Sequence, residues 1–352
     1  MSTTTEQPVR TSPAPQATAS SKFIAKVFKA RELAVAAVLV VMLGATQISN
    51  GEFLSEQGIK DLMLNATILV LVAVGQAVVV ITRNVDLSVG SVLGISAFAA
   101  GNYLQSGGNS LVAVLLAVAL GMLFGALNGA LVSLGKVPAL VVTLGTLYVV
   151  RGIDSIWVGA SQITADGLPD AFVDFGHEGL WVVPYLALLA VVTLLAVGYY
   201  MRNYRSGRDM YALGSSPEAA VLAGVPVRKR IMTAYMLCGA LAGLAGALYL
   251  ARFGNVDSAT GNGYELTVVS AVVVGGVAFT GGSGTVYGAA LGAVLLTSIN
   301  SVLPAIGVSS VWVTAINGVL LLLAIAVDRI LALRVAGVLR KKAAQMRSAR
   351  HA

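Results

Sequence analysis

The sequence contains few of the residues on which disulfide bonds, metal sites and catalytic centres depend. Its one cysteine, Cys238, lies in an apolar run, so no disulfide can form within the chain. The two histidines, His177 and His351, are too few for a histidine-rich metal site. The glycine-rich stretch GGSGT at 281–285 lacks the Gly-Lys-Ser/Thr that completes a phosphate-binding loop. We therefore expect no enzyme activity, no metal and no cofactor in this chain.

Charged residues are also scarce, at 11% of the 352 positions, compared with about 25% in soluble globular proteins. Hydrophobic residues instead make up 57% of the chain, and the mean hydropathy is +0.84. This composition is typical of a polytopic membrane protein. The net charge of +7 would favour a nucleic-acid partner in a soluble protein. In a membrane protein it is better explained by orientation in the bilayer, so we expect no nucleic acid.

Ten segments are apolar enough to be membrane-spanning helices, each of which needs about 20 residues. We therefore predict an all-α polytopic fold with about ten transmembrane helices. Several segments are short or broken by glycine, and the third and ninth are candidates for partly re-entrant elements. The ten segments are 33–48, 60–82, 88–105, 110–134, 138–158, 181–201, 231–252, 265–280, 284–303 and 309–327.

Basic residues fall on one side of this predicted topology. If the N-terminus is cytoplasmic, 20 of the 23 lysines and arginines lie in cytoplasmic segments, and the exceptions are Lys60, Arg151 and Arg252. The loops assigned to the outside collect acidic residues instead. This distribution agrees with the positive-inside rule. It predicts a multi-pass protein of the plasma (cytoplasmic) membrane with both termini inside.

The parts outside the spans differ in composition. Residues 1–32 are rich in Pro, Ser and Thr and then basic, which predicts a disordered cytoplasmic tail and not a signal peptide. The membrane domain is expected at 33–327, with a cytoplasmic loop at 202–230. A basic cytoplasmic tail is expected at 328–352.

Uncharged polar residues are scattered through the predicted spans. They can bind the hydroxyl groups of a neutral solute, or they can form hydrogen bonds between helices, worth roughly 0.6 kcal/mol each. The second role is favoured for any single residue, whereas the set as a whole suits a path for an uncharged solute better than an ion filter. With two charged residues included, the candidates for a translocation path are Asn65, Gln76, Asp86, Ser88, Asn128, Thr143, Thr146, Arg151 and Asn300.

Two charged residues, Arg151 and Asp154, share a face of one predicted span because they are three positions apart. Charges at membrane depth usually face a bundle interior or a cavity, so Arg151 is a candidate gate or path residue. A structural ion pair near the outer interface is the favoured alternative. The only clear candidates for buried carboxylates are Asp86 and Asp154, which argues against proton coupling and leaves sodium coupling open.

The loop at 202–230 contains the pattern of a short helix. Ser215 or Ser216 provides an N-cap, Pro217 the first helical position, and Glu218 an acidic first turn. Gly224 ends the helix after about two turns, too few to be stable without a surface to pack against. We expect a docking helix for a cytoplasmic partner, with a segment lying on lipid headgroups as the alternative. Its small apolar face is Ala219, Ala220, Leu222 and Ala223.

Four stretches, in this order, carry a family resemblance. They are VDLSVGS (85–91), NGALVSLGKVPALVVTLGTLYVVRG (128–152), GRDMYALGSSPEAAVLAGV (207–225) and GNGYELTVVSAVVVGGVAFTGGSGTVYGAALGA (261–293). The chain resembles the permease subunit of bacterial ATP-binding-cassette (ABC) sugar importers of the ribose type, which are related to branched-chain amino-acid permeases. The resemblance covers about residues 60–327.

The resemblance implies partners that composition does not reveal. A second permease copy or a sister permease would complete the pathway, and an extracytoplasmic sugar-binding protein would deliver the substrate. A cytoplasmic ABC ATPase would bind ATP and Mg²⁺ and would hydrolyse the ATP. That ATPase would dock on the short helix, matched here by Pro217, Glu218, Ala219, Ala220 and Gly224. The implied function is import of a monosaccharide such as rhamnose or ribose.

The substrate stays open at this point. Arg83 and Asn84, directly before the first motif, look closer to the rhamnose and autoinducer-2 branch than to the ribose branch. Another solute of the same family (autoinducer-2, a nucleoside or an amino acid) is one alternative. An autonomous secondary sugar carrier is another. The long N-terminal tail departs from compact members of the family.

Overall fold

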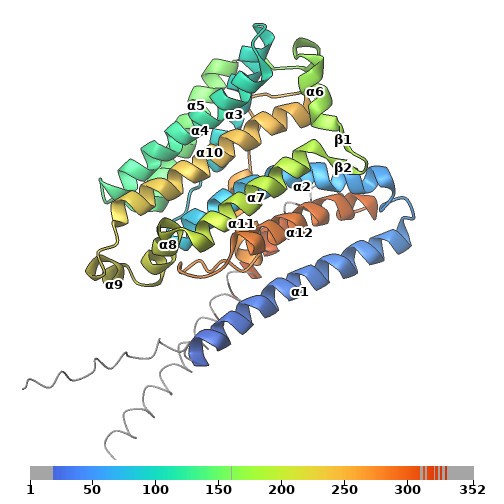
Figure 1. The fold of residues 1–352 in the computed structure, drawn as a ribbon. Helices are drawn as coiled ribbons and strands as arrows, with labels where there is room; N and C mark the ends of the chain where they lie inside the picture. Colours follow the sequence, from blue (N-terminus) through green and yellow to red (C-terminus); the bar gives the residue numbers. More distant parts are fainter. Residues whose placement is uncertain are drawn as a thin grey trace, which may run out of the picture.

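The computed structural model describes residues 19–159 and 161–309 and positions 312, 313, 315–320, 322, 323, 326 and 330. Most of these residues are helical (Figure 1), which confirms the predicted all-α fold. The helices are α1 (Ala19–Ser49), α2 (Glu56–Ile81), α3 (Val89–Gln105), α4 (Ser110–Ser133), α5 (Ala139–Val158), α6 (Asp170–His177), α7 (Tyr185–Asn203), α8 (Arg205–Ser215), α9 (Pro217–Leu222), α10 (Val227–Phe253), α11 (Tyr264–Val274) and α12 (Val286–Ala305). Between α5 and α7 lie a 3-10 turn (Ala165–Gly167) and a short antiparallel hairpin, β1 (Gly179–Leu180) and β2 (Val183–Pro184).

Seven of the described helices are long and apolar enough to cross a membrane: α1, α2, α4, α5, α7, α10 and α12. Each coincides with one of the ten predicted segments. The third and eighth segments are the shorter helices α3, with 17 residues, and α11, with 11. The expectation of a re-entrant ninth segment is wrong, because α12 is a single helix of 20 residues. The tenth segment lies partly outside the described residues.

Helix α2 forms the centre of the bundle. Every residue from Ala66 to Ile81 is buried, and the helix packs against α7, α10, α11 and α12. A helix that is apolar on all sides needs such an interior position, or lipid around it. The other helices therefore enclose the second half of α2, which carries Gln76 and is followed by the connection to α3.

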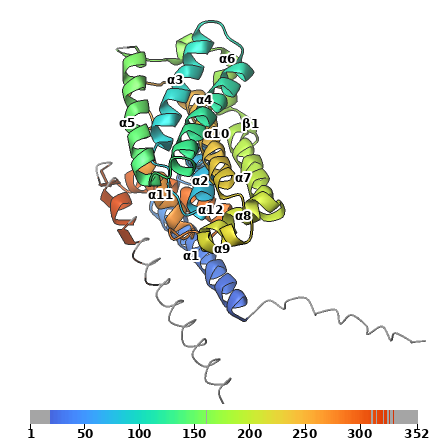
Figure 2. The same ribbon diagram turned by 90° about the vertical axis from the view of Figure 1, so that its left-hand side faces the viewer.

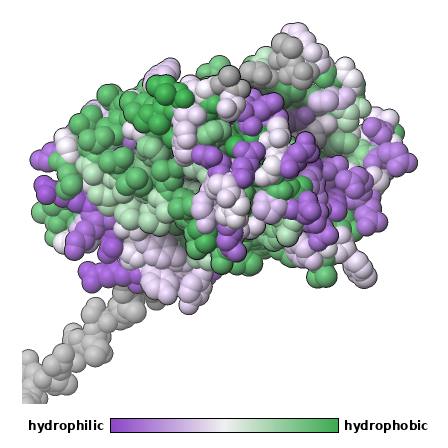
Figure 3. All heavy atoms as spheres, turned by 90° about the horizontal axis from the view of Figure 1, so that it is seen from above, coloured by the Kyte–Doolittle hydropathy of each residue, from purple (hydrophilic) through white to green (hydrophobic). Residues whose placement is uncertain are grey.

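Helices α4, α5 and α7 provide much of the apolar outer surface. Large side chains exposed on them include Leu123, Leu127, Leu140, Ile156 and Leu195. Hydrophobic residues cover a broad part of the surface in Figure 3, above all in its left half, whereas polar residues gather in the right half and along the lower left edge. Exposed apolar areas of this extent mark a membrane or protein contact. In a multi-span protein we assign them to contact with lipid.

Two non-helical segments interrupt the helices, and we call them the first and the second extended segment; the second contains several turns and is only partly buried. Residues 82–88 connect α2 to α3, and residues 254–263 connect α10 to α11. Gly94 on α3 leaves room for the second segment, because a Cβ there would lie 2.5 Å from the Thr260 carbonyl oxygen. In a membrane protein, non-helical backbone is tolerated only inside protein or against a cavity. These two segments supply the polar positions from which the candidate site is built.

The N-terminal region differs from the expected disordered tail. Helix α1 begins at Ala19, so 19–32 is helical. The helix lies at the edge of the bundle beside α12 (Figures 1 and 2), where Thr285 donates a 2.7 Å hydrogen bond to Glu32. Residues 1–18 and most of the predicted basic tail at 328–352 lie outside the described residues.

Candidate functional site

A buried carboxylate lies in the first extended segment. Asp86 is 1% exposed, and its Oδ1 accepts hydrogen bonds from the backbone N–H of Ser88 at 2.9 Å and from the Ser88 hydroxyl at 2.6 Å. The amide nitrogen of Asn128 on α4 donates to Ser88 Oγ at 2.9 Å. The same nitrogen lies 3.4 Å from Asp86 Oδ1. A buried carboxylate requires such donors, because it has lost its hydration. The segment is thereby attached to α4.

Helices α5 and α10 join the same network. Thr146 on α5 donates to Asn128 Oδ1 at 2.6 Å. One turn earlier, Thr143 lies 3.4 Å from the carbonyl oxygen of Val85, to which Tyr235 on α10 also donates at 3.1 Å. Tyr235 was missed by sequence reasoning, because it stands in an apolar helix without any neighbouring motif.

Helix α2 completes the network through Gln76. Its amide nitrogen lies 3.1 Å from the Asp86 carbonyl oxygen, and its amide oxygen lies 3.2 Å from the Asp86 backbone nitrogen. The Cys238 thiol is 3.7 Å from the same amide. The structure thus brings together six of the predicted path residues, namely Gln76, Asp86, Ser88, Asn128, Thr143 and Thr146. They bond to one another and to backbone, and we call them, with Tyr235, the Asp86 network.

The other two uncharged candidates, Asn65 on α2 and Asn300 on α12, line a separate cavity of about 550 Å³. We call it the amide cavity. Its polar lining consists of amides and hydroxyls, supplied also by Asn262, Thr267, Ser270, Thr297, Ser301 and Asn317. Phe253, Tyr264 and Leu69 add apolar surface. No charged side chain lines the cavity among the described residues. Such a lining can bind a neutral solute through its hydroxyl groups and its apolar faces.

The amide cavity depends on the second extended segment. Asn262 and Gly263 come from the end of that segment, and Tyr264 is the first residue of α11. Among the described residues, the Asn65 side chain has no hydrogen-bond partner, and Asn300 accepts only from Asn317, at 3.2 Å. The amides of this cavity are therefore available to a ligand, unlike those of the Asp86 network.

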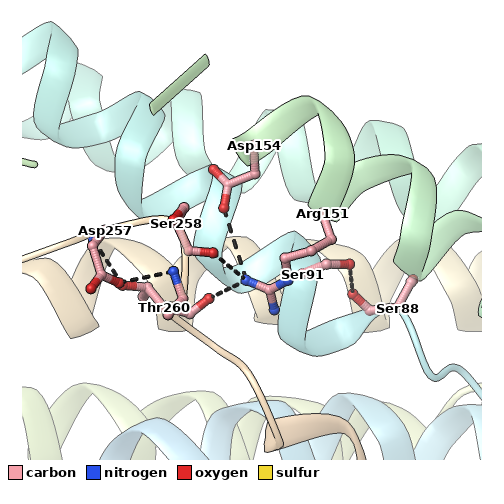
Figure 4. Close-up of polar contacts among 8 residues, drawn as sticks. Ser88, Ser91, Arg151, Asp154, Asp257, Ser258 and Thr260 are labelled. Carbon is pink, nitrogen blue, oxygen red and sulfur yellow. Dashed lines mark hydrogen bonds and ion pairs between the residues drawn. The ribbon is translucent and has the colours of Figure 1, made fainter. Parts of the chain in front are cut away.

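Arg151 holds the second extended segment from the side of α5 (Figure 4). Its Nη1 donates to the carbonyl oxygen of Thr260 at 2.7 Å and to that of Ser258 at 3.3 Å. The predicted pair with Asp154 is present, but at 3.9 Å it is the longest of these contacts. Arg151 thus fixes the backbone that leads to Asn262 in the amide cavity. Sequence reasoning missed these carbonyls, which lie more than 100 residues away.

Asp154 gives this cluster an excess of negative charge. Its side chain is fully buried, and neither carboxylate oxygen has a hydrogen-bond partner among the described residues. Asp257, on the extended segment, instead accepts from Thr260 Oγ1 at 3.1 Å. The guanidinium of Arg151 is therefore the positive charge that pairs with Asp154. Removing Arg151 would leave the buried carboxylate of Asp154 without a counter-charge.

The predicted docking helix is α9. Ser216 is its N-cap, with the hydroxyl 3.3 Å from the Ala219 backbone nitrogen, and Pro217 is the first helical residue, as predicted. Gly224 follows the helix with φ of +73°, a conformation that favours glycine. The apolar face differs from the expected one, because Ala220 is buried while Leu222 is 90% exposed. Val221 is also exposed, so α9 presents a two-residue apolar tip to the surroundings.

A second helix of the same loop, α8, was not predicted and connects α9 to the bundle. Arg230 donates two hydrogen bonds, of 3.0 and 2.7 Å, to Asp209 on α8. Tyr211 donates to the carbonyl oxygen of Gly284, at 3.1 Å, in the loop before α12. Burial raises the pKa of Tyr211 to about 12, so this phenol stays a donor even in moderately alkaline solution.

The loop before α12 also contacts the end of α2, the central helix. The backbone nitrogen of Gly282 donates to the carbonyl oxygen of Ile81, the last residue of α2, at 2.9 Å. Ser215, at the end of α8, donates to Gly282 O at 3.3 Å. A continuous set of contacts therefore joins α9 to α8, to the loop before α12 and to the central helix.

Known proteins resemble this chain over most of its length. Residues 58–325 match the family described as branched-chain amino acid transport system / permease component. The autoinducer 2 import system permease protein LsrC of Enterobacter sp. (strain 638) is 38% identical over 275 residues, which cover 78% of this chain and 80% of the relative. The protein of the same name from Salmonella typhi is 37% identical over 282 residues, or 80% of each chain. No solved structure was found to match.

Proposed function

The chain belongs to the branched-chain amino acid transport system permease family and is a permease subunit of an ABC importer, and we propose that it carries a neutral, hydroxylated solute of monosaccharide size. The amide cavity is the observation that carries this proposal. Its volume of about 550 Å³ and its lining of amides and hydroxyls suit such a solute. Small-molecule sites fall in the range of roughly 300–1,000 Å³.

The cavity does not by itself select one substrate. Rhamnose, ribose and similar monosaccharides fit its chemistry, and so does autoinducer 2, which the names of the relatives above favour. An amino acid fits less well, because its carboxylate and ammonium groups would find no opposite charge in the described lining.

The energy for transport is proposed to enter at α9. A cytoplasmic ABC ATPase, which would bind ATP and Mg²⁺, would cover the exposed side chains of Val221 and Leu222. Its movement would pass through α8 to Gly282 and Gly284 and from there to the end of α2. A second permease, either another copy or a sister chain, would complete the pathway.

Substrate would enter from the opposite end, delivered by an extracytoplasmic binding protein. The amide cavity lies near the outer end assigned by the charge distribution, because Phe253 ends α10 there and Asn300 lies one turn and a half before the end of α12. Arg151 holds the adjoining segment and is proposed to set the outer edge of this cavity. The solute is expected to bind weakly, so that it can leave on the other side.

Reconstitution tests the function directly. The permease, with its cognate ATPase and binding protein, is placed in liposomes, and uptake of labelled rhamnose, ribose and autoinducer 2 is measured with and without ATP. We expect uptake of one of these solutes only with ATP, and none of the corresponding phosphorylated sugar. Uptake by the permease alone would instead identify a secondary carrier and overturn the proposal of ATP coupling.

Variants of α9 test where the energy enters. Leu222→Asp places a charge on a side chain that is 90% exposed, so it should leave the fold intact. We expect uptake to fall below about a tenth, the loss that corresponds to roughly 1.4 kcal/mol of docking energy. Glu218→Arg is expected to act in the same direction, while Lys229→Gln, which removes an exposed charge in the first turn of α10, is the control. Normal ATP-driven uptake in both variants would rule out α9 as the docking helix.

A further inference from the structure

An open pocket lies at the end of the bundle where α4 is connected to α5. It has a volume of about 470 Å³ and is formed where α4 ends, α5 begins and α10 begins. Lys136 lines it from the α4–α5 connection and Arg228 from the first turn of α10, together with Asn84 and Ser133. The charge distribution assigns this end of the helices to the cytoplasmic side. We call it the basic pocket.

The two basic side chains of this pocket are free to bind an anion. Lys136 and Arg228 are both exposed, and neither has an ion-pair partner among the described residues. The neighbouring Arg230 is engaged by Asp209. Lys136 has φ of +55°, a left-handed conformation that a lysine seldom adopts. The chain therefore holds a basic residue at the pocket at some conformational cost.

A buried hydroxyl gives an independent indication of a ligand. Ser133 is only 7% exposed and lines the pocket, and its Oγ has no hydrogen-bond partner among the described residues. A serine at the end of a helix commonly bonds to a carbonyl four residues earlier. Ser133 does not form this bond, so its buried hydroxyl is an unused donor beside the pocket. A phosphate oxygen is an acceptor of the required kind.

The surface next to the pocket is apolar. Leu131 and Leu134, near the end of α4, are 50% and 58% exposed, and Leu140 and Val141, at the start of α5, are 53% and 61% exposed. These side chains lie on the faces assigned to lipid contact. A ligand that satisfies both regions carries an anionic group and hydrocarbon chains on one molecule. A free phosphate ion would satisfy only the first region.

We propose that the basic pocket binds the phosphate of an anionic phospholipid of the cytoplasmic leaflet, with its acyl chains along the apolar surface of α4 and α5. Lys136 and Arg228 provide the positive charge, and Ser133 donates a hydrogen bond. Basic sites between helices on the cytoplasmic side are suited to such headgroups. The bound lipid would hold together the start of α10 and the α4–α5 connection, close to α9.

Native mass spectrometry of the purified full-length chain tests this assignment with phosphatidylglycerol, phosphatidylcholine and inorganic phosphate. We expect phosphatidylglycerol to bind at least fivefold more tightly than phosphatidylcholine. The double variant Lys136→Gln/Arg228→Gln should lose this preference, while Lys229→Gln, which removes an exposed charge outside the pocket lining, should retain it. Ser133→Ala keeps both charges and should weaken phosphatidylglycerol binding about twofold to fivefold.

Three results would overturn the proposal. Full competition by inorganic phosphate would identify a site for soluble anions. Equal losses in Lys229→Gln and in the double variant would show a diffuse charge effect. Unchanged phosphatidylglycerol binding in the double variant and in Ser133→Ala would leave the pocket without a lipid. Should the double variant unfold, judged by its melting temperature without lipid, Ser133→Ala and the single variant Lys136→Gln decide the question.

Discussion

The Asp86 network and the amide cavity are built from the same kinds of residue, yet they differ in what their hydrogen bonds do. In the network, Oδ1 of Asp86 already accepts hydrogen bonds from Ser88, and Asn128 is fully buried between Ser88 and Thr146. In the cavity, Asn65 has no hydrogen-bond partner among the described residues, and neither does Asn317 Oδ1.

This difference separates two roles that polar residues have inside a membrane. A closed network holds non-helical backbone in place, because every group that leaves it loses a partner in an apolar environment. An open set of amides can exchange partners with a solute. We therefore expect substitutions in the network to act on stability, and substitutions in the cavity to act on uptake.

The largest effect is expected at the centre of the network. Asp86→Ala removes the acceptor of two hydrogen bonds from Ser88 and leaves those donors and Asn128 without it. The expected loss is about 3 kcal/mol in the free energy of unfolding. It is measured as the melting temperature in detergent and as the yield of folded protein in the membrane.

Asn65→Ala is the matched control for this prediction, because it removes an amide from the same helical bundle without breaking a described hydrogen bond. Its melting temperature should stay close to that of the unmodified chain. A large loss of stability in Asn65→Ala, or none in Asp86→Ala, would abolish the distinction between the two regions.

Arg151 holds the segment beside the cavity, and its loss is expected to act on the cavity and also to lower the melting temperature, because Asp154 is left without a counter-charge. Arg151→Gln removes the charge near Asp154 and weakens the hold on Thr260 and Ser258. We expect a loss of about tenfold in uptake, or roughly 1.4 kcal/mol, mainly as a raised KM. Arg151→Lys should recover only part of the lost uptake, since an ammonium group lacks the fixed fork of a guanidinium.

A thiol at Asn262 distinguishes a displaced segment from a general loss of structure. Asn262→Cys is introduced together with Cys238→Ala, so that the new thiol is the only one. Its reaction with a membrane-impermeant maleimide should be faster when Arg151 is Gln than when it is Arg. Equal rates in the two proteins would show that Arg151 does not hold this segment.

Within the cavity, Asn300→Ala is expected to raise the KM for uptake about fivefold, since one hydrogen bond contributes about 1 kcal/mol. The maximal rate should change less, because the residue lies far from α9. Uptake is measured as initial rates over a range of substrate concentrations. An unchanged KM in both Asn300→Ala and Asn65→Ala would show that the cavity is not on the path.

The sequence predicts the helices better than it predicts which distant residues come together in the fold. Hydropathy located nine helices, and capping residues located α9, because both signals are local. The contacts of Arg151 with Ser258 and Thr260, and the meeting of Asn65 with Asn300, join segments more than 100 residues apart. No local pattern encodes them. Helix α8 was missed for another reason: it is amphipathic and polar, so a search for apolar runs passes over it.

The smallest effects come from one substitution made in both regions. Thr146→Val removes the donor to Asn128 Oδ1 with little change of shape, which should cost about 1 kcal/mol of stability and leave the KM unchanged. Thr267→Val, in the amide cavity, should raise the KM slightly with little change in the melting temperature, because Thr267 is half-buried and its hydroxyl bonds only to the carbonyl oxygen of Gly263, the residue before α11. Melting curves and uptake rates of both variants check the pair. If the two threonines behaved alike in both measurements, hydrogen-bond closure would not be what separates the network from the cavity.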